Sequence, residues 1–183
     1  MIGVVLTGGK SERFGTDKAF VELDGKFLYQ RQAELLSEFC DKLFISCNNS
    51  QESMLNGYDL IIDELESQGP LQGLVQVFQQ HESDCMVLAC DLPQIQSTDL
   101  DQVRRQSEGY DLTIALSKSG REQPLCSIWK TKAMKAAITY YQSGGRKMMT
   151  LLNQPSIQVG KVELADDALL NLNFSEDLNK LKG

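Results

Sequence analysis

Glycines and cations gather directly after the first apolar run of the chain, in the segment LTGGKSERFGTDK at residues 6–18. Gly8 and Gly9 follow IGVVL, so backbone amides at that point can face an anion without obstruction by side chains. Arg13 and Lys18 add positive charge that can meet a phosphate tail. Two glycines alone would be explained better by a solvated turn, but together with these cations they favour a phosphate-binding loop.

Neither of the familiar phosphate-loop patterns fits this segment. Walker A places a lysine directly after its second glycine, whereas Thr16 follows Gly15 here. The dinucleotide fingerprint Gly-x-Gly-x-x-Gly fails as well, because the glycines fall at positions 8, 9 and 15. The spacing therefore indicates a wider loop, with the phosphate-binding backbone at one end and cations on the far arm.

Asp91 is the carboxylate best placed for a metal ion. It closes the apolar run CMVLAC and precedes Leu92 and Pro93, so a rigid turn would hold it at the end of a strand. A carboxylate at such a position can coordinate a hard cation such as Mg²⁺. A helix N-cap or a loop charge is the alternative, and the nearby phosphate loop favours the metal.

Asp63 ends another apolar run and is a candidate for nucleobase recognition. Guanine presents adjacent N–H donors on its Watson–Crick edge, which a carboxylate can accept and which adenine does not offer. The following Glu64 and Glu66 are expected to be solvated loop charges.

The chain has one histidine, His81, and no serine or cysteine is obviously paired with it. It follows two glutamines at the end of an amphipathic segment, which favours a surface histidine at a helix end over a catalytic base. A phosphate monoester acting as nucleophile needs no such base, because its second pKa is about 6 and it is largely dianionic near pH 7. A site of glycines, Arg13, Lys18 and Asp91 could work by positioning and charge neutralisation.

Short apolar runs alternate with amphipathic stretches along the chain, which is typical of a doubly wound, mainly parallel sheet of the α/β class. Several runs are apolar throughout, as expected of strands that are buried on both faces. The predicted strands are Ile2–Leu6, Leu43–Cys47, Leu60–Ile62, Cys85–Cys90, Leu112–Leu116, Leu125–Trp129 and a weaker one near Ile157–Val162.

Three amphipathic segments predict helices. Each carries apolar residues at helical spacing, so that they share one face. The clearest face consists of Leu71, Leu74, Val75 and Phe78; the others consist of Leu28, Leu35, Leu36 and Phe39, and of Leu100 and Val103 in a segment capped by Ser97 or Thr98.

Ligands of such sheets bind beyond the carboxyl ends of the strands. The residues that follow the first four predicted strands are therefore expected to meet: Gly8, Asn48, Asp63 and Asp91. No internal repeat or linker divides the chain, which predicts one domain over 1–183. The segment at about 120–145 is mixed in character and is a candidate for the site of a second substrate.

Composition and charge narrow the class of protein. The 183 residues are 42% hydrophobic and 23% charged, enough for an ordinary core. The net charge of −7 argues against a nucleic-acid partner, because such proteins normally carry a basic face, but it allows a nucleotide substrate. No apolar run approaches the roughly 20 residues of a membrane span, and no signal peptide is recognisable, so we expect a cytoplasmic protein without a membrane partner.

The cysteines indicate reduced thiols in the core. Their number is odd, none form a Cys-x-x-Cys pair, and a single histidine makes a zinc site improbable. They are Cys40, Cys47, Cys85, Cys90 and Cys126.

The segment LTGGKSERFGTDKAF closely resembles the nucleotidyltransferase signature Leu-Ala-Gly-Gly-x-Ser-x-Arg-Met-Gly-x-Asp-Lys-Ala, specifically that of the molybdenum cofactor guanylyltransferases, the MobA family. The Asp17-Lys18-Ala19 ending separates this family from the sugar-phosphate nucleotidyltransferases. Thr7 stands in place of the usual alanine and Phe14 in place of the usual methionine; both changes are mild.

The resemblance continues along nearly the whole chain. Two departures occur outside the loop: Phe27 replaces a proline, and Phe174 and Ser175 replace threonine and proline near the end. The matching segments are DGKFLYQRQ, SCNNSQ with Asn48, IIDELESQGPLQGL with Asp63, Gly69, Pro70, Leu71 and Gly73, LACDLPQI with Asp91, GREQPLCSIW, GGRKMMTLL, and NLNFSEDL with Asn171 and Asn173.

The resemblance implies a three-layer α/β/α, Rossmann-like nucleotidyltransferase fold, with a nucleotide-binding half at about 1–95 and a cofactor-binding half at about 96–183. It implies transfer of GMP from GTP to the terminal phosphate of the molybdopterin form of the molybdenum cofactor, with release of pyrophosphate. Mg²⁺ would be the metal, with molybdoenzymes and other cofactor-biosynthesis proteins as possible partners.

The same resemblance implies roles for particular residues. Arg13, Lys18 and Asp91 would be catalytic, and Asp91 would also be the metal ligand. The nucleotide would contact Leu6, Thr7, Gly8, Gly9, Lys18, Asn48, Asp63, Gly69, Pro70, Leu71 and Asp91. The pterin, on weaker grounds, would contact Arg146, Lys147, Asn171 and Asn173.

Three alternatives stay open. A cytidylyltransferase would act on the same cofactor with CTP, and the choice of base is the least specified part of the hypothesis. A non-catalytic module that delivers nucleotide or cofactor should have lost Lys18 or Asp91, and both are present. A purely structural domain would leave the loop chemistry unexplained.

Overall fold

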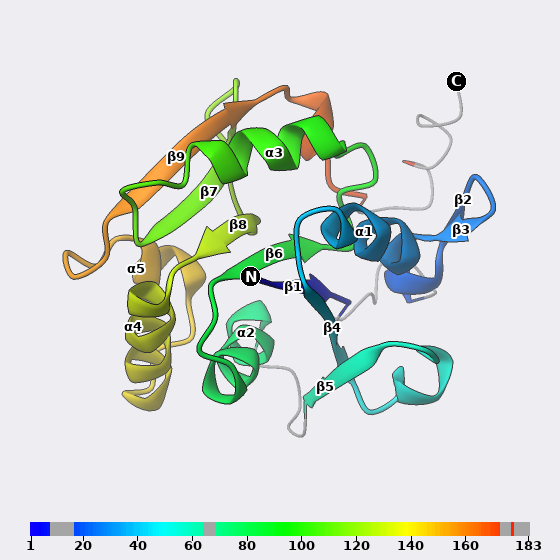
Figure 1. The fold of residues 1–183 in the computed structure, drawn as a ribbon, viewed down its shortest axis with the longest axis horizontal. Coiled ribbons are helices and arrows are strands. Elements are labelled where there is room, and N and C mark those ends of the chain that lie inside the picture. The colour runs from blue at the N-terminus through cyan, green and yellow to red at the C-terminus, as the bar shows by residue number, and fades with distance from the viewer. Residues whose placement is uncertain (8–16, 64–68, 173–176, 178–183) are drawn as a thin grey trace.

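The computed structural model of the chain describes residues 1–7, 17–63, 69–172 and 177 (Figure 1). A central sheet carries helices on both of its faces. On one face lie α1 (Leu28–Ser37) and α3 (Ser97–Arg105); on the other lie α2 (Pro70–Gln80), α4 (Thr131–Gln142) and α5 (Met148–Leu152). This arrangement is the predicted three-layer α/β/α fold.

The sheet has seven strands in the order β5-β4-β1-β6-β8-β7-β9. All the neighbouring pairs are parallel except those made by β8, which runs antiparallel between β6 and β7. The sheet is thus mainly parallel, as predicted. Its strands are β1 (Ile2–Leu6), β4 (Lys42–Asn48), β5 (Asp59–Asp63), β6 (Cys85–Ala89), β7 (Leu112–Ser117), β8 (Glu122–Trp129) and β9 (Val159–Leu164).

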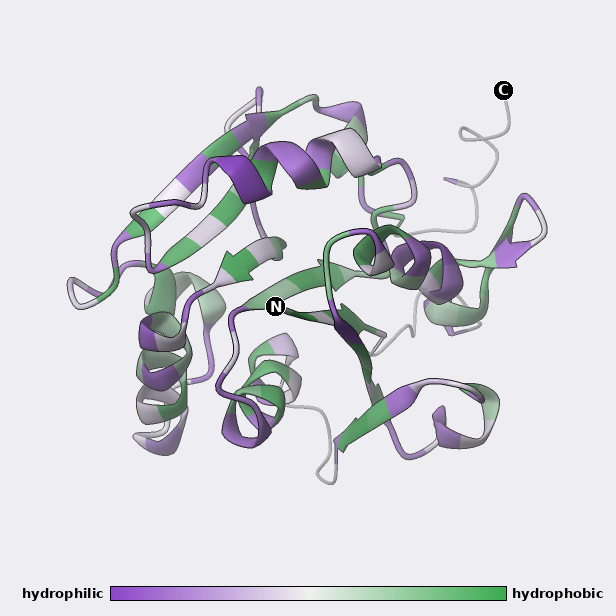
Figure 2. Cartoon of the chain, viewed as in Figure 1, coloured by the Kyte–Doolittle hydropathy of each residue, from purple (hydrophilic) through white to green (hydrophobic). Residues whose placement is uncertain are grey.

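The central strands are apolar because they are covered on both sides. Every residue of β1 and β6 is buried. Along β1, Val4 packs into the core with α2 and α4, whereas Val5 packs into the core with α1. Figure 2 shows the same contrast between the hydrophobic central strands and the hydrophilic outer side of α3.

The predicted apolar faces of α2 and α3 are confirmed, but Phe39 of the predicted first face lies beyond the end of α1, and one cap was wrongly predicted. Leu71, Leu74, Val75 and Phe78 of α2 are all buried. The prediction of Ser97 or Thr98 as the cap of α3 was wrong: the N-cap is Gln96, whose backbone N–H donates to Asp99 at 2.9 Å. The Ser97 hydroxyl instead donates to Glu38 at the end of α1, at 2.5 Å.

Two kinds of smaller element were not predicted. The two-residue strands β2 (Glu22–Leu23) and β3 (Lys26–Phe27) form a hairpin before α1. Three 3₁₀ turns, η1 (Lys18–Phe20), η2 (Glu52–Met54) and η3 (Asp167–Leu169), connect larger elements. They are too short for hydrophobic periodicity to reveal, yet η1 and η2 lie where the candidate site is built.

The cysteines are unpaired thiols within the fold, as predicted. Burial raises the pKa of the Cys126 thiol to about 12, which leaves it protonated at neutral pH. Within the described ranges, no helix is both long enough and apolar enough to cross a membrane.

Candidate active site

The carboxyl ends of four parallel strands lie at one edge of the sheet. In register, Leu6 of β1 is opposite Ser46 of β4 and Ala89 of β6, and Asn48 of β4 is opposite Asp63 of β5. The predicted meeting of the strand-end residues is therefore confirmed for those that are described. The positions Gly8, Gly9, Arg13 and Asn173 lie outside the described residues.

Thr7 leads out of β1 and is tied to β4. Its backbone N–H donates to the Ser46 carbonyl at 3.0 Å. The single proton of its hydroxyl is shared between that carbonyl, at 2.9 Å, and Gln51 Oε1, at 3.1 Å. An alanine, the usual residue of the resembled signature, could not make the hydroxyl contacts. The hydroxyl that distinguishes Thr7 from that alanine is therefore hydrogen-bonded in this chain.

Asp17 and Lys18 begin the described part of the chain after the glycine-rich loop. Asp17 caps η1, since its Oδ1 accepts a hydrogen bond from the Ala19 N–H at 3.1 Å. Its other oxygen, Oδ2, accepts from Gln51 Nε2 at 2.5 Å. The backbone that carries Lys18 is therefore anchored immediately before the lysine.

The charges of Lys18 and Asp91, two candidate catalytic residues, both affect the pKa of the Cys90 thiol. Burial raises the pKa of the Cys90 thiol strongly; the negative charges of Asp91 and Asp17 raise it further, and the positive charge of Lys18 opposes them. Lys18 and Asp91 therefore both belong to the electrostatic surroundings of the Cys90 thiol.

Asp91 lies in the turn after β6, and the backbone around it is held on both sides. The Asp91 carbonyl accepts from the Leu172 N–H at 2.8 Å. The next carbonyl, that of Leu92, accepts from Gln32 Nε2 of α1 at 2.8 Å. Cys90 N–H donates to Leu6 of β1 at 3.1 Å, so the turn is fixed to the neighbouring strand as well.

The Asp91 carboxylate has an oxygen that fits a metal ion. Its Oδ1 is buried and has no hydrogen-bond partner among the described residues, which is uncommon for a buried polar atom. Hard cations such as Mg²⁺ prefer carboxylate oxygen and are often held by one or two carboxylates with substrate phosphates and water. Among the described residues no cluster of three or more His, Cys, Asp or Glu could hold a metal. The donor set therefore suits Mg²⁺ shared with a substrate, not an all-protein metal cage.

Asp63 is largely buried at the end of β5. Burial raises the pKa of its carboxyl from 3.8 to about 6. With the amide nitrogen of Gln76 turned toward β5, that nitrogen lies 2.8 Å from Asp63 Oδ1 and 3.2 Å from the Ile62 carbonyl. One side of the carboxylate thus faces α2.

Glycines bring α2 to this edge of the sheet. Gly69 is the N-cap of α2 with φ of 95°, a conformation that favours glycine, and Pro70 begins the helix. At Gly73, an added Cβ would lie 2.4 Å from Ser46 Oγ and 3.5 Å from Asp63 Oδ1. The Gly-Pro-Leu-x-Gly stretch therefore fixes the start of α2 against the ends of β4 and β5.

Leu6 and Leu71 have buried side chains that belong to the core. Any nucleotide contact at these two positions would come from the backbone.

The predicted pterin residues are not brought together as one group. Asn171 lies near Asp91, the candidate metal ligand, because the N–H of the following Leu172 donates to the Asp91 carbonyl. The Asn171 Oδ1 accepts a hydrogen bond from Gln123 Nε2 at 2.8 Å. Arg146 is exposed, lies 4.0 Å above the Tyr141 ring and donates to the Tyr141 and Gly145 carbonyls. Lys147 caps α5. These contacts place Arg146 and Lys147 in the α4–α5 connection and Asn171 near β6.

The segment at 120–145, a candidate for the site of a second substrate, includes β8 and α4. Its start contacts the chain near Asn171 through Gln123, and Arg121 donates to the Leu169 carbonyl. The second half of β8 is buried, whereas α4 buries Ala133, Met134 and Ala137 and leaves much of its surface accessible.

His81 caps the C-terminal end of α2, and its ring lies 4.3 Å from that of Phe44, measured between centroids. This position agrees with a helix-end histidine away from the catalytic edge.

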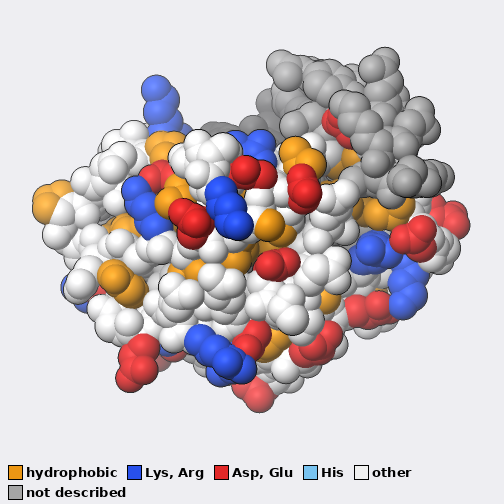
Figure 3. All heavy atoms as spheres, turned by 90° about the horizontal axis from the view of Figure 1, so that it is seen from above, with side chains coloured by type: hydrophobic (Ala, Val, Ile, Leu, Met, Phe, Trp, Pro, Cys, Tyr) orange, Lys and Arg blue, Asp and Glu red, His pale blue; other side chains and the backbone are white. Residues whose placement is uncertain are grey.

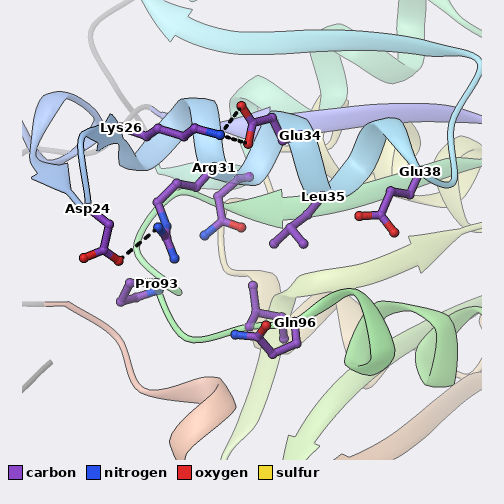
Figure 4. A pocket seen from close by; sticks show the side chains of 10 residues that line it. Asp24, Lys26, Arg31, Glu34, Leu35, Glu38, Pro93 and Gln96 are labelled. Carbon is purple, nitrogen blue, oxygen red and sulfur yellow. Dashed lines mark hydrogen bonds and ion pairs between the residues drawn. The ribbon is translucent and has the colours of Figure 1, made fainter.

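A hollow of about 360 Å³ lies next to the Asp91 turn and was not predicted. It is bordered by the β2–β3 hairpin, α1 and the segment at 93–96. Figure 4 shows that ion pairs line it, Asp24 with Arg31 and Lys26 with Glu34, with Gln96 and Pro93 opposite. Residues this far apart in the chain give no local signal of a pocket.

Buried glutamine amides were also missed, among them Gln72, which is 2% exposed. Gln51 and Gln32 are at most 1% exposed, and Gln123 is 8% exposed. Gln32 had a detectable signal: it lies four residues from both Leu28 and Leu36 on the buried face of α1. A polar residue in the middle of an apolar stripe is expected to have a specific partner.

Basic and acidic side chains are interspersed on the face seen in Figure 3, with no gathering of Lys and Arg there.

Comparisons with known proteins agree with this picture. A family model described as the MobA-like NTP transferase domain matches residues 3–159. A probable molybdenum cofactor guanylyltransferase from Bacillus subtilis is 30% identical over 190 residues, covering 99% of this chain and 94% of that protein. A molybdenum cofactor guanylyltransferase from Histophilus somni is 29% identical, covering 97% and 93%.

One relative is longer than this chain. A molybdenum cofactor biosynthesis bifunctional protein from Synechocystis sp. is 28% identical over 99% of this chain, which spans about half of that protein, 53%.

Solved structures share the fold. Molybdopterin-guanine dinucleotide biosynthesis protein A from Archaeoglobus fulgidus superposes with a TM-score of 0.79 at 22% identity, covering 98% of this chain and 96% of that one. A 2-C-methyl-D-erythritol 4-phosphate cytidylyltransferase from Thermus thermophilus superposes with a TM-score of 0.74 at 12% identity, covering 97% and 95%.

The family model and the named relatives, together with the shared fold, place the protein in the class of nucleotidyltransferases. Within that class, the chain belongs to the MobA-like NTP transferase domain family.

Proposed function

We propose that this enzyme transfers GMP from GTP to the terminal phosphate of the molybdopterin form of the molybdenum cofactor. An oxygen of that phosphate attacks the α-phosphorus of GTP and forms a new P–O–P linkage. The bond from the α-phosphorus to the bridging oxygen breaks, and pyrophosphate leaves with that electron pair. Because the attacking phosphate is already largely dianionic near neutral pH, no proton needs to be removed by a side chain.

The observation that carries the proposal is the buried, unpartnered Oδ1 of Asp91 in the neighbourhood of Lys18. A bound Mg²⁺ at this oxygen would supply positive charge to phosphate oxygens. Lys18 would bind the phosphates of GTP, together with the amides of Gly8 and Gly9 and the side chain of Arg13. Such charges act best when they are fixed before the reaction, and the hydrogen bonds of Asp17 and Leu92 hold the backbone at Lys18 and Asp91 in this way.

The nucleoside would be placed by Asn48 and Asp63. Their side chains leave β4 and β5 at paired positions, next to the start of α2. An ionised Asp63 could accept the N–H groups of guanine. The names of the Bacillus and Histophilus relatives support GTP as the nucleotide.

A pyrophosphate-release assay tests this function. The protein is incubated with molybdopterin, Mg²⁺ and, separately, each of the four nucleoside triphosphates. We expect pyrophosphate release with GTP and with none of the other three nucleotides. If none of the four nucleotides gives release, the enzyme hypothesis is rejected and a module that delivers nucleotide or cofactor is favoured.

Cytidylyl transfer is the second candidate, because a cytidylyltransferase shares the fold across nearly the whole chain. Turnover with CTP and not with GTP would replace our assignment of the base while leaving the reaction type unchanged. We place the reaction in the cytoplasm, where molybdoenzymes could receive the product.

A further inference from the structure

Gln51 follows β4 and is completely buried, with an exposed fraction of 0%. Its backbone N–H donates to the Asn48 carbonyl at 3.0 Å and to Asn48 Oδ1 at 3.1 Å. The turn between these residues is thereby closed, and the Gln51 side chain points back toward the ends of the strands, where its partners lie.

The side-chain amide of Gln51 makes four hydrogen bonds. The oxygen Oε1 accepts from the Thr7 hydroxyl at 3.1 Å and from the Asn48 N–H at 3.0 Å. The nitrogen Nε2 donates to the Thr7 carbonyl at 3.2 Å and to Asp17 Oδ2 at 2.5 Å. Both N–H groups of Gln51 are therefore used, and its oxygen accepts from the Asn48 N–H and from the Thr7 hydroxyl, whose proton it shares with the Ser46 carbonyl.

These bonds join three segments that are far apart in sequence. Thr7 leads into the glycine-rich loop, Asp17 ends it, and Asn48 ends β4. One side chain thus holds both arms of the loop and the strand end that would place the nucleoside. A fully satisfied buried polar network of this kind specifies a single arrangement of the groups it joins.

The geometry points to Gln51 as a positioning residue, which fixes the Lys18 arm of the loop relative to the nucleoside-binding end of β4. This inference rests on the proposed nucleotidyl transfer, in which Lys18 meets the phosphates while Asn48 places the nucleoside of the same molecule. Gln51 itself touches no reacting atom; it acts through Asp17, Thr7 and Asn48.

Only an amide satisfies all four contacts. A carboxylate in the same shape cannot donate to Asp17, and it would place two negative groups within hydrogen-bond distance. The charged neighbours in the chain are Glu52, which follows Gln51 and begins η2, and Lys18, which follows Asp17. Exchange of the two functional groups, with Asn at position 17 and Glu at position 51, restores a donor opposite an acceptor.

The experiment compares wild type with Gln51→Glu, Asp17→Asn and the double variant Asp17→Asn/Gln51→Glu. Gln102→Glu is the matched control, because Gln102 is exposed on α3 and donates only to the Glu163 carbonyl in the described structure. Two readouts are used: amide hydrogen exchange of the peptide spanning 17–21, and steady-state kinetics with each substrate varied in turn.

Hydrogen exchange tests the positioning without any turnover. We expect Gln51→Glu to speed exchange at the Ala19 amide about tenfold, because Asp17 loses its partner and the cap loosens. The double variant should recover most of the protection, and Gln102→Glu should match wild type. Unchanged exchange in Gln51→Glu, or a double variant no better protected than the single one, would overturn the inference whether or not the protein turns over GTP.

Kinetics separates positioning from a purely structural role. We expect kcat/KM for GTP to fall about 10- to 100-fold in Gln51→Glu, with KM for molybdopterin unchanged. A structural role would lower the amount of folded enzyme and leave KM for both substrates alone. Wild type without turnover would reject the proposed function only, since the exchange data stand independently.

Discussion

Individual side chains of this protein have environments that set their ionisation and their partners. Asp63 ends β5 and Asp91 lies in the turn after β6 of the same sheet. Asp91 has a buried oxygen without a hydrogen-bond partner among the described residues, whereas Asp63 has a raised pKa and a neighbour on α2. Because their surroundings differ, we propose a metal-binding role for Asp91 and a base-recognition role for Asp63.

Asp91→Asn should leave the protein folded and reduce turnover strongly. The amide keeps the size of the side chain and the backbone bonds to Leu172 and Gln32, but it removes the negative charge that would hold Mg²⁺. We expect kcat to fall at least about a hundredfold at fixed Mg²⁺, with a circular dichroism spectrum like that of wild type. An active variant would remove Asp91 from the metal site.

Asp63 should make stability depend on pH. Burial raises its folded pKa from 3.8 to about 6, so the native state retains a proton that the unfolded chain releases between these values. The contribution is fully present below about pH 4 and is lost as pH rises through about 6. Urea unfolding of wild type should therefore show a steeper fall in the free energy of unfolding from pH 4 to 6 than Asp63→Asn does.

Asp59→Asn provides the control for this pH effect. Asp59 begins the same strand and is exposed. Its replacement should therefore leave the fall in the free energy of unfolding between pH 4 and 6 as it is in wild type. Equal slopes in wild type and Asp63→Asn would show that the Asp63 carboxyl is not the responsible group.

At the scale of elements, the site depends on how closely α2 approaches β4 and β5. Gly73 is a point of close approach, because Ser46 Oγ occupies the space that a Cβ would need. Most of the elements could be predicted from periodicity, but this approach could not, because it is a distance between segments that pattern alone does not contain. The antiparallel direction of β8 could not be predicted from its pattern either, because it is defined by the pairing of β8 with β6 and β7.

Gly73→Val should destabilise the fold by about 1–3 kcal/mol, because the branched side chain forces α2 away from the strand ends. Gln79→Val is the matched control: it places the same residue on the exposed side of the same helix and should cost only about 0.5 kcal/mol in helix propensity. Urea unfolding measures both, and equal stabilities would show that α2 has room at Gly73.

At the scale of the whole molecule, the nucleotide is expected to bridge several elements at once. Its proposed contacts come from the ends of β1, β4, β5 and β6 and from the start of α2. A ligand that binds only the folded state raises its stability by mass action. Binding should therefore be visible in the unfolding of the entire chain.

GTP with Mg²⁺ should raise the melting temperature, and EDTA should remove most of the effect. At a ligand concentration of 100 Kd the gain is about 2.7 kcal/mol, which corresponds to roughly 5–10 °C for a domain of this size. The fluorescence of Trp129, which is fully buried against Phe78, reports the transition. An equal shift with ATP would contradict recognition of guanine.

The sequence by itself determined the class of fold, the order of the strands along the chain and the residues at their carboxyl ends. This is because apolar runs, amphipathic periods and the glycine-rich loop are local signals. Only the tertiary structure decided that Gln51 joins Thr7, Asp17 and Asn48, and that Arg146 and Asn171 make their contacts in separate places. Hydrogen bonds between distant segments depend on the relative position of folded elements, and no spacing within a single segment records that position.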